Sequence, residues 1–220
     1  MKILSKVTFV TSLGIVGLTV LVLAADHPAA SVSPDAALAK LKEGNARFTG
    51  NPISTGKPTA ARRAETAQEQ HPFAVILGCA DSRTSPEIIF DQNIGDLFVI
   101  RTAGNLVDDH ALGSIEYAVD HLGARLIVVL GHQRCGAVNA AIASDTAPGH
   151  VQSLVSDIQP AVKAVKGKQG DVTDLTIAEN ARLMAEKIRS EAKLGDLSKQ
   201  VRIISAVYDL DTGKVAWAGE

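Results

Sequence analysis

Three short apolar runs, separated by segments with a helical pattern, restrict the fold of this chain more than any other feature. The runs are FAVILG (73–78), DLFVIR (96–101) and RLIVVLG (125–131), and each has the length and apolar content of a buried strand. Helices are expected between them, over 85–90 and 109–122. Because strands that alternate with helices favour a parallel sheet, the sequence predicts an α/β fold.

The remaining segments add helices around this sheet and one antiparallel strand. Further helices are expected at 34–48, 136–144, 151–165 and 175–194, and the polar segment 62–70 is also read as helical. The closing segment, 201–218, reads as two strands around an Asp-Thr-Gly turn. The expected fold is a central, mostly parallel β-sheet flanked by helices, with an antiparallel C-terminal strand and an N-terminal helical arm.

The beginning of the chain has the layout of a secretory signal peptide. Two lysines precede 19 uncharged residues from Val7 to Ala25, and small residues stand before Asp26. An uncleaved membrane anchor is the alternative, because such a stretch could nearly span a bilayer. We expect a signal peptide at 1–25, a linker at 26–33 and one domain at 34–220, exported to the periplasm without stable membrane association after cleavage.

Charge and missing motifs exclude several classes of protein. The formal net charge of −2 argues against a dedicated nucleic-acid binder, which would usually carry a basic surplus. The sequence contains no GxSxG, P-loop or GxGxxG pattern, so serine hydrolases, nucleoside triphosphatases and dinucleotide-binding enzymes have no support.

Two polar motifs directly follow the first and third predicted strands. Cys79, Asp81 and Arg83 lie in GCADSRTSP, and His132 and Cys135 lie in GHQRCG. If the two strands are neighbours, both motifs meet in one crevice at the carboxyl ends of the strands. Two sulfurs, a nitrogen and an oxygen favour zinc over magnesium or calcium. A disulfide between the chain's two cysteines, which export would permit, is the alternative.

Asp81 cannot serve the metal and Arg83 fully at the same time. As a fourth protein ligand it would close the zinc site, which would then be structural or inactive. A charge-assisted pair with Arg83 would instead leave that position to water, whose pKa zinc lowers to about 7. The sequence therefore indicates a possible gate, although a surface ion pair of little consequence would have the same spacing.

The two motifs resemble those of the β-class carbonic anhydrases, in the plant-like branch with exported bacterial members. CADSR and GHQRCGAV carry the resemblance, which extends from about Ser33 to Trp217 with support from GDLFVIRTAGNLV, GSIEYAVDHLG and YDLDTGKV. It implies a carbonate dehydratase, a lyase that reversibly hydrates carbon dioxide to bicarbonate and a proton. It further implies one zinc per chain on Cys79, His132 and Cys135, a zinc-bound hydroxide as nucleophile, and Asp81 paired to Arg83 while accepting a hydrogen bond from that hydroxide.

The resemblance also implies a substrate pocket and an oligomer. The pocket would consist of Gln70, Phe98, Ala103, Tyr117 and Gly136. Homodimers or homotetramers are expected, with pockets that use residues from two subunits and an N-terminal helix that crosses to the neighbour.

Three positions depart from the family's pattern. Ala80 replaces a usual serine at a position that is not a ligand, and Ala103 is smaller than the valine of the plant-like branch. Members that bicarbonate inhibits through a separate site carry a tryptophan where this chain has Ile76, which argues against that allosteric pocket.

Three other functions remain open at this point. The same scaffold could hydrolyse carbonyl sulfide or carbon disulfide. Asp81 locked on the metal would leave a non-catalytic zinc- or bicarbonate-binding protein. A Cys79–Cys135 disulfide would leave a protein without metal.

Overall fold

The computed structural model describes residues 32–50 and 59–218. The predicted signal peptide lies outside these residues, as does most of the predicted linker. Within the described ranges, no helix combines the length and the apolar character that crossing a membrane requires.

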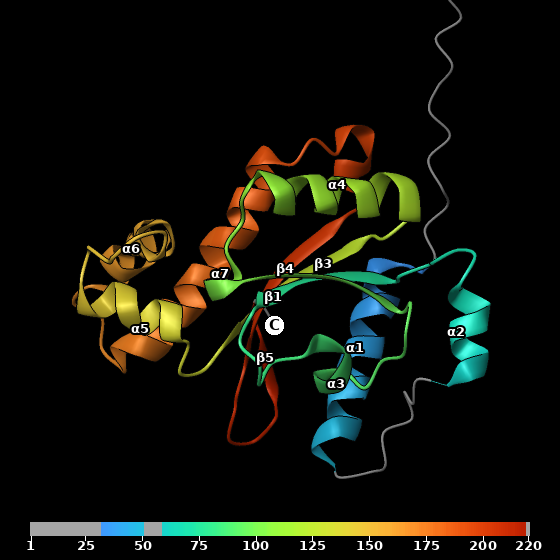
Figure 1. Ribbon diagram of the computed structural model, residues 1–220, viewed down its shortest axis with the longest axis horizontal. Coiled ribbons are helices and arrows are strands. Elements are labelled where there is room, and N and C mark those ends of the chain that lie inside the picture. The colour runs from blue at the N-terminus through green and yellow to red at the C-terminus, as the bar shows by residue number, and fades with distance from the viewer. Residues whose placement is uncertain (1–31, 51–58, 219–220) are drawn as a thin grey trace, which may run out of the picture.

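A five-stranded sheet forms the centre of the domain (Figure 1). The strand order is β2-β1-β3-β4-β5; four strands run parallel and β5 is antiparallel to β4. The strands are β1 (Ala74–Cys79), β2 (Leu97–Thr102), β3 (Leu126–His132), β4 (Arg202–Tyr208) and β5 (Val215–Trp217). This topology confirms the predicted fold class, including the antiparallel strand at the C-terminus.

Helices cover both faces of the sheet (Figure 1). One face packs against α1 (Pro34–Thr49) and α3 (Pro86–Ile89). The other packs against α4 (Asp109–Leu122), α5 (Gly136–Ala143), α6 (Val151–Val165) and α7 (Val172–Glu191). Side chains of β1 alternate between these layers, with Val75 and Leu77 toward α4–α7 and Ala74 and Ile76 toward α1. Because both faces of β1 are covered, it reads as a continuous apolar run.

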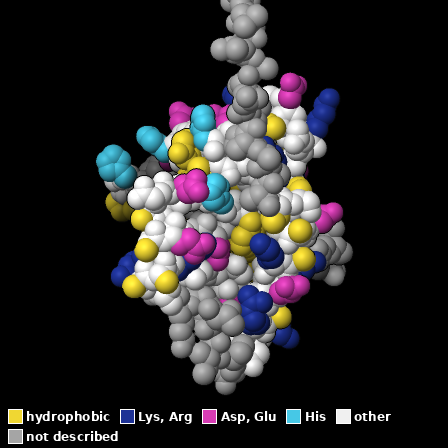
Figure 2. Space-filling model, turned by 90° about the vertical axis from the view of Figure 1, so that its right-hand side faces the viewer, with side chains coloured by type: hydrophobic (Ala, Val, Ile, Leu, Met, Phe, Trp, Pro, Cys, Tyr) yellow, Lys and Arg dark blue, Asp and Glu magenta, His cyan; other side chains and the backbone are white. Residues whose placement is uncertain are grey.

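The short helix α2 (Ala60–Thr66) lies at the periphery and is held by polar contacts. Arg62 donates one hydrogen bond to the Asp96 carboxylate at 2.8 Å and another to the carbonyl of Ile94 at 2.8 Å. On the face shown in Figure 2, basic side chains are interspersed with acidic ones and do not form a continuous basic area.

The N-terminal helix α1 begins and packs as its sequence predicts. The Ser33 hydroxyl accepts a hydrogen bond from the Ala36 amide at 3.2 Å, and Pro34 is the first helical residue. Its apolar face, including Leu38 and Leu41, is buried against the sheet of its own chain. Crossing of this helix to a second subunit stays a prediction.

Two helices begin and end earlier than expected. The segment predicted at 62–70 is α2, over Ala60–Thr66, where the Thr59 hydroxyl accepts a hydrogen bond from the Arg62 amide at 3.0 Å as the N-cap. The helix predicted at 175–194 is α7, over Val172–Glu191. The Asp171 carboxylate accepts hydrogen bonds from the amides of Thr173 and Asp174, each at 2.9 Å. This N-cap moves the start of the helix toward the N-terminus.

Candidate metal centre

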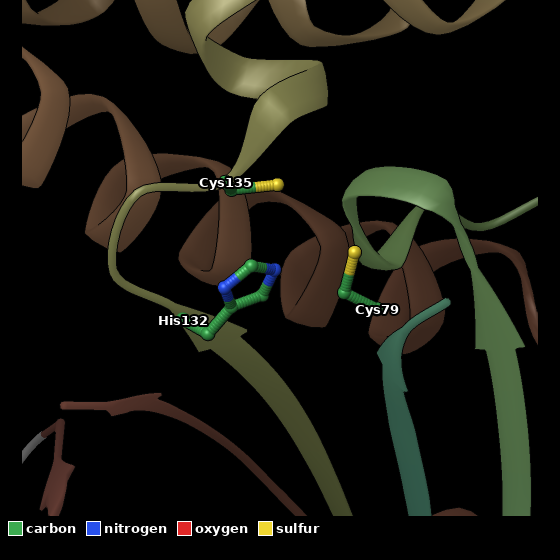
Figure 3. Close-up of side chains that lie close together, drawn as sticks. All are labelled: Cys79, His132 and Cys135. Carbon is green, nitrogen blue, oxygen red and sulfur yellow. The ribbon is translucent and has the colours of Figure 1, made fainter. Parts of the chain in front are cut away.

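Three possible metal ligands lie together at the carboxyl end of the sheet. Cys79 ends β1, His132 ends β3 and Cys135 immediately precedes α5. The register pairs Gly78 with Leu130, so the two strands end side by side. One ligand atom from each of the three residues lies within 4.8 Å of the others, and all three side chains are buried. Figure 3 shows the two sulfurs and the imidazole directed toward a common centre.

The imidazole of His132 is oriented for metal binding. Its Nδ1 lies 2.8 Å from the carbonyl oxygen of Gln133. Because a carbonyl only accepts, Nδ1 must carry a proton, and in the neutral imidazole Nε2 then presents a lone pair. Nε2 is buried and has no hydrogen-bond partner among the described residues. A buried nitrogen without a partner is costly unless something binds there, so this atom indicates a ligand position.

The two cysteine sulfurs lie close together, and each shifts the pKa of the other. Both are free thiols, without a disulfide between them. The pKa of Cys79 is lowered chiefly because the Cys135 thiol donates to its sulfur, and the Gly104 amide also stabilises the thiolate. The same contact raises the pKa of Cys135, since Cys79 holds the negative charge. The Gly104 amide nitrogen lies 3.3 Å from the Cys79 sulfur. Two soft sulfurs and one imidazole nitrogen suit zinc.

Asp81 lies beside this centre but is paired with Arg83. Nε of Arg83 donates to Oδ1 at 2.9 Å, and Nη2 donates to Oδ2 at 2.7 Å. The Arg83 amide adds a third bond to Oδ1 at 3.0 Å. These bonds hold the pKa of Asp81 well below its usual range. Oδ2 is 3.9 Å from Nε2 of His132, so the paired carboxylate still faces the centre.

Arg101 is a residue of this site that the sequence interpretation missed. Its Nε donates to the carbonyl of Cys79 at 2.9 Å and its Nη2 to the carbonyl of Asp81 at 2.6 Å. The Thr84 hydroxyl donates to the same Asp81 carbonyl at 3.0 Å. The available signal was an arginine at the end of a strand whose preceding residues, 97–100, are all apolar.

The loop that carries the other two ligands is held from the opposite side. Arg134 has a positive φ of 52°, and its carbonyl lies 3.4 Å from Nη2 of Arg83. Its guanidinium makes two hydrogen bonds to the Asp211 carboxylate, at 2.8 and 2.9 Å. The turn between β4 and β5 therefore supports the segment between His132 and Cys135.

A single chain brings only part of the predicted pocket near this centre. Ala103 directly precedes Gly104, and Gly136 directly follows Cys135. Phe98 and Tyr117 contact each other with ring centroids 6.3 Å apart, and Tyr117 is 48% exposed. Gln70 is exposed and precedes β1, whose opposite end carries Cys79. At about 3.3 Å per residue, β1 alone spans roughly 17 Å, so Gln70 does not reach the centre of its own chain.

Comparisons with known proteins agree on one family. The family model described as carbonic anhydrase matches residues 74–215. Carbonic anhydrase 2 of Mycobacterium tuberculosis is 41% identical over 193 residues, which cover 84% of this chain and 92% of that protein. Carbonic anhydrase of Mycolicibacterium smegmatis is 39% identical over 193 residues, covering 83% and 92%.

Solved structures give the same result for the fold. The β-carbonic anhydrase of Coccomyxa, in complex with acetazolamide, aligns with a TM-score of 0.62 and 29% identity, covering 70% of this chain and 75% of that chain. A tetrameric β-carbonic anhydrase of Sordaria macrospora aligns with a TM-score of 0.61 at 22% identity, covering 73% and 90%.

Proposed function

The chain belongs to the β-class carbonic anhydrases and is thus a carbonate dehydratase, a lyase, and we propose that Cys79, His132 and Cys135 hold its zinc while Arg83 keeps Asp81 off the metal. The reaction is the reversible conversion of carbon dioxide and water to bicarbonate and a proton. The observation that carries the proposal is the Nε2 lone pair of His132, buried without a partner and within 4.8 Å of two cysteine sulfurs.

The donor set fits zinc in number and in kind. Three protein ligands leave a position for water or substrate, as in catalytic zinc sites, whereas four would close the site. Zinc held there would act as a Lewis acid that makes a hydroxide nucleophile available near neutral pH.

The roles of the neighbouring residues follow from their bonds. Arg83 occupies both carboxylate oxygens of Asp81, which lowers their tendency to coordinate a metal. Because the carboxylate stays ionised, it can only accept hydrogen bonds, and its Oδ2 lies 3.9 Å from Nε2 of His132. Asp81 would thus orient the reacting water by accepting its proton in a hydrogen bond.

The substrate pocket would be completed by a second subunit. Gln70 lies at the far end of β1 from Cys79, so its proposed contact with substrate requires a neighbouring copy of the chain. Mixing tests this arrangement. Gln70→Ala chains and Cys135→Ala chains should each be weak or inactive, yet mixed dimers should regain activity, since one of their two sites then has both residues intact. Mixed dimers without any recovery would contradict a shared pocket.

Stopped-flow hydration of carbon dioxide by zinc-loaded protein from Ala25 onward tests the activity. Activity that rises between about pH 6.5 and 9 is expected for a hydroxide nucleophile. Inhibition by acetazolamide, the compound in the Coccomyxa complex, is expected as well. Cys135→Ala should abolish zinc binding and activity together, while near-normal zinc content in that variant would contradict the ligand assignment.

Export to the periplasm is proposed from the lysines and uncharged stretch at the N-terminus. N-terminal sequencing of the protein isolated from its native host should give a chain that begins near Ala25 or Asp26. A chain that retains Met1 and sediments with membranes would favour the anchor.

A further inference from the structure

Cys79 is held from a helix that is remote from it in the sequence. The Nδ2 of Asn180, on α7, donates to the carbonyl of Gly104 at 2.9 Å. The amide of the same Gly104 donates to the Cys79 sulfur, 3.3 Å away. Asn180 is 1% exposed, and its bond to Gly104 is buried. A chain of two hydrogen bonds therefore links α7 to a ligand of the proposed metal centre.

Gly104 needs this restraint more than another residue would. Its φ of 74° and ψ of 17° lie in the left-handed region, which a glycine enters and leaves easily. Its N–H and its C=O flank a single Cα, so fixing the carbonyl limits the directions in which the N–H can point. The bond from Asn180 therefore restrains the direction of that N–H.

The orientation of the Asn180 amide follows from its neighbour. A carbonyl can only accept, so the NH₂ group of Asn180 must face Gly104. This leaves Oδ1 of Asn180 buried without a partner among the described residues. A leucine would remove this unsatisfied oxygen but would also take the donor from the buried Gly104 carbonyl, so what the amide supplies here is its bond to Gly104.

The same helix also contacts the strand that carries His132. Gly131 directly precedes His132, and a Cβ on Gly131 would lie 3.2 Å from Cγ2 of Ile177 and 3.6 Å from Cβ of Ala181. One turn of α7 thus packs against the end of β3. The same turn carries Asn180, which bonds to Gly104 beside Cys79.

We infer that Asn180 is a positioning residue for the metal ligand Cys79, acting through the Gly104 amide. The inference rests on the proposed zinc centre. The N–H···S bond stabilises the thiolate and fixes the direction of its sulfur. Hydrogen-bond partners of metal ligands commonly change metal affinity by about 10- to 100-fold when they are removed.

Nuclear magnetic resonance of the full-length protein loaded with ¹¹³Cd tests the link without a variant. A through-bond coupling is expected between ¹¹³Cd and the Gly104 amide proton, because the Cys79 sulfur joins them. A spectrum of the cadmium-loaded protein without that coupling would overturn the inference. Failure to bind one cadmium or zinc per chain would instead contradict the metal centre itself.

Asn180→Leu tests the role of the side chain, with Thr176→Val as a matched control. Thr176 is buried on the same helix, but its hydroxyl bonds only within α7, to the Val172 carbonyl at 2.6 Å. Loss of zinc to a chelator should be about 10-fold faster or more in Asn180→Leu and unchanged in Thr176→Val. In cobalt-loaded protein, the thiolate-to-cobalt charge-transfer band should shift only in Asn180→Leu. Equal zinc release in both variants, or an unchanged band in Asn180→Leu, would contradict a positioning role.

Discussion

Replacing Gly104 with alanine should destabilise the protein by an amount that the structure allows one to work out. The backbone there has a φ of 74°, and an alanine in the left-handed region costs about 1–2 kcal/mol. The new Cβ would lie 3.0 Å from Cδ1 of Ile158 and 3.3 Å from Cβ of Ala137. Such overpacking adds about 1–3 kcal/mol. The two effects sum to about 3 kcal/mol, or roughly a 10 °C lower Tm for a domain of this size.

Thermal unfolding monitored by circular dichroism measures this change, and two further variants separate its causes. Gly113→Ala is the control: the position lies inside α4, a Cβ added there would have nothing within 4 Å, and alanine should raise stability by up to about 1 kcal/mol. Ile158→Val removes Cδ1, so in the double variant with Gly104→Ala it should offset part of the steric cost. If Gly104→Ala were as stable as the wild type, neither the left-handed backbone nor the contact of the new Cβ with Ile158 and Ala137 would carry the expected cost.

Three other perturbations have defined outcomes. Arg83→Ala should keep one zinc per chain but lower carbon dioxide hydration, because Asp81 loses its two side-chain bonds; unchanged turnover would argue against the gate. Removal of zinc by a chelator should lower Tm, since a ligand at 1,000 times its Kd stabilises by about 4 kcal/mol, and Cys135→Ala should not respond. The pKa of Glu179 is lowered by Arg182, so the ionised carboxylate stabilises the folded state at neutral pH. This stabilisation is lost as pH falls below about 4.3. At neutral pH the Tm of Glu179→Gln should be about 1 °C below that of the wild type, because such a pair contributes about 0.3–0.5 kcal/mol. This difference should vanish near pH 3. A difference that persists there would contradict the role of the ionised carboxylate.

The strands and the three residues of the proposed metal centre could be predicted because their signals are local. Apolar runs of strand length end at Gly78 and Gly131, and the polar motifs begin at the next residues. Pairing of β1 with β3, which the sequence left as a condition, then brings Cys79 and His132 together. The start of α7 was also encoded locally, in Asp171 followed by Asp174, but the apolar pattern alone placed the helix three residues too late.

Residues that act through backbone groups could not be found in this way. Arg101 and Asn180 bond to carbonyls of residues 22 and 76 positions away, and a carbonyl leaves no mark in the sequence. Their role depends on how β2 and α7 lie against β1, which is a tertiary property. Gln70 illustrates a related limit, because its spacing from Cys79 carries no information on which subunit's centre it would serve.

Asp81 is held by more than a surface ion pair. Arg83 is half exposed, and an exposed pair alone would contribute little. However, the Arg83 backbone amide also bonds to Oδ1 of Asp81, and the carbonyl of Asp81 accepts from Arg101 and Thr84. These bonds fix the backbone around the carboxylate independently of the guanidinium. It follows that Arg83→Ala should free Asp81 only in part, since one of its three carboxylate bonds survives, and that residual activity should distinguish this variant from Cys135→Ala, which has none.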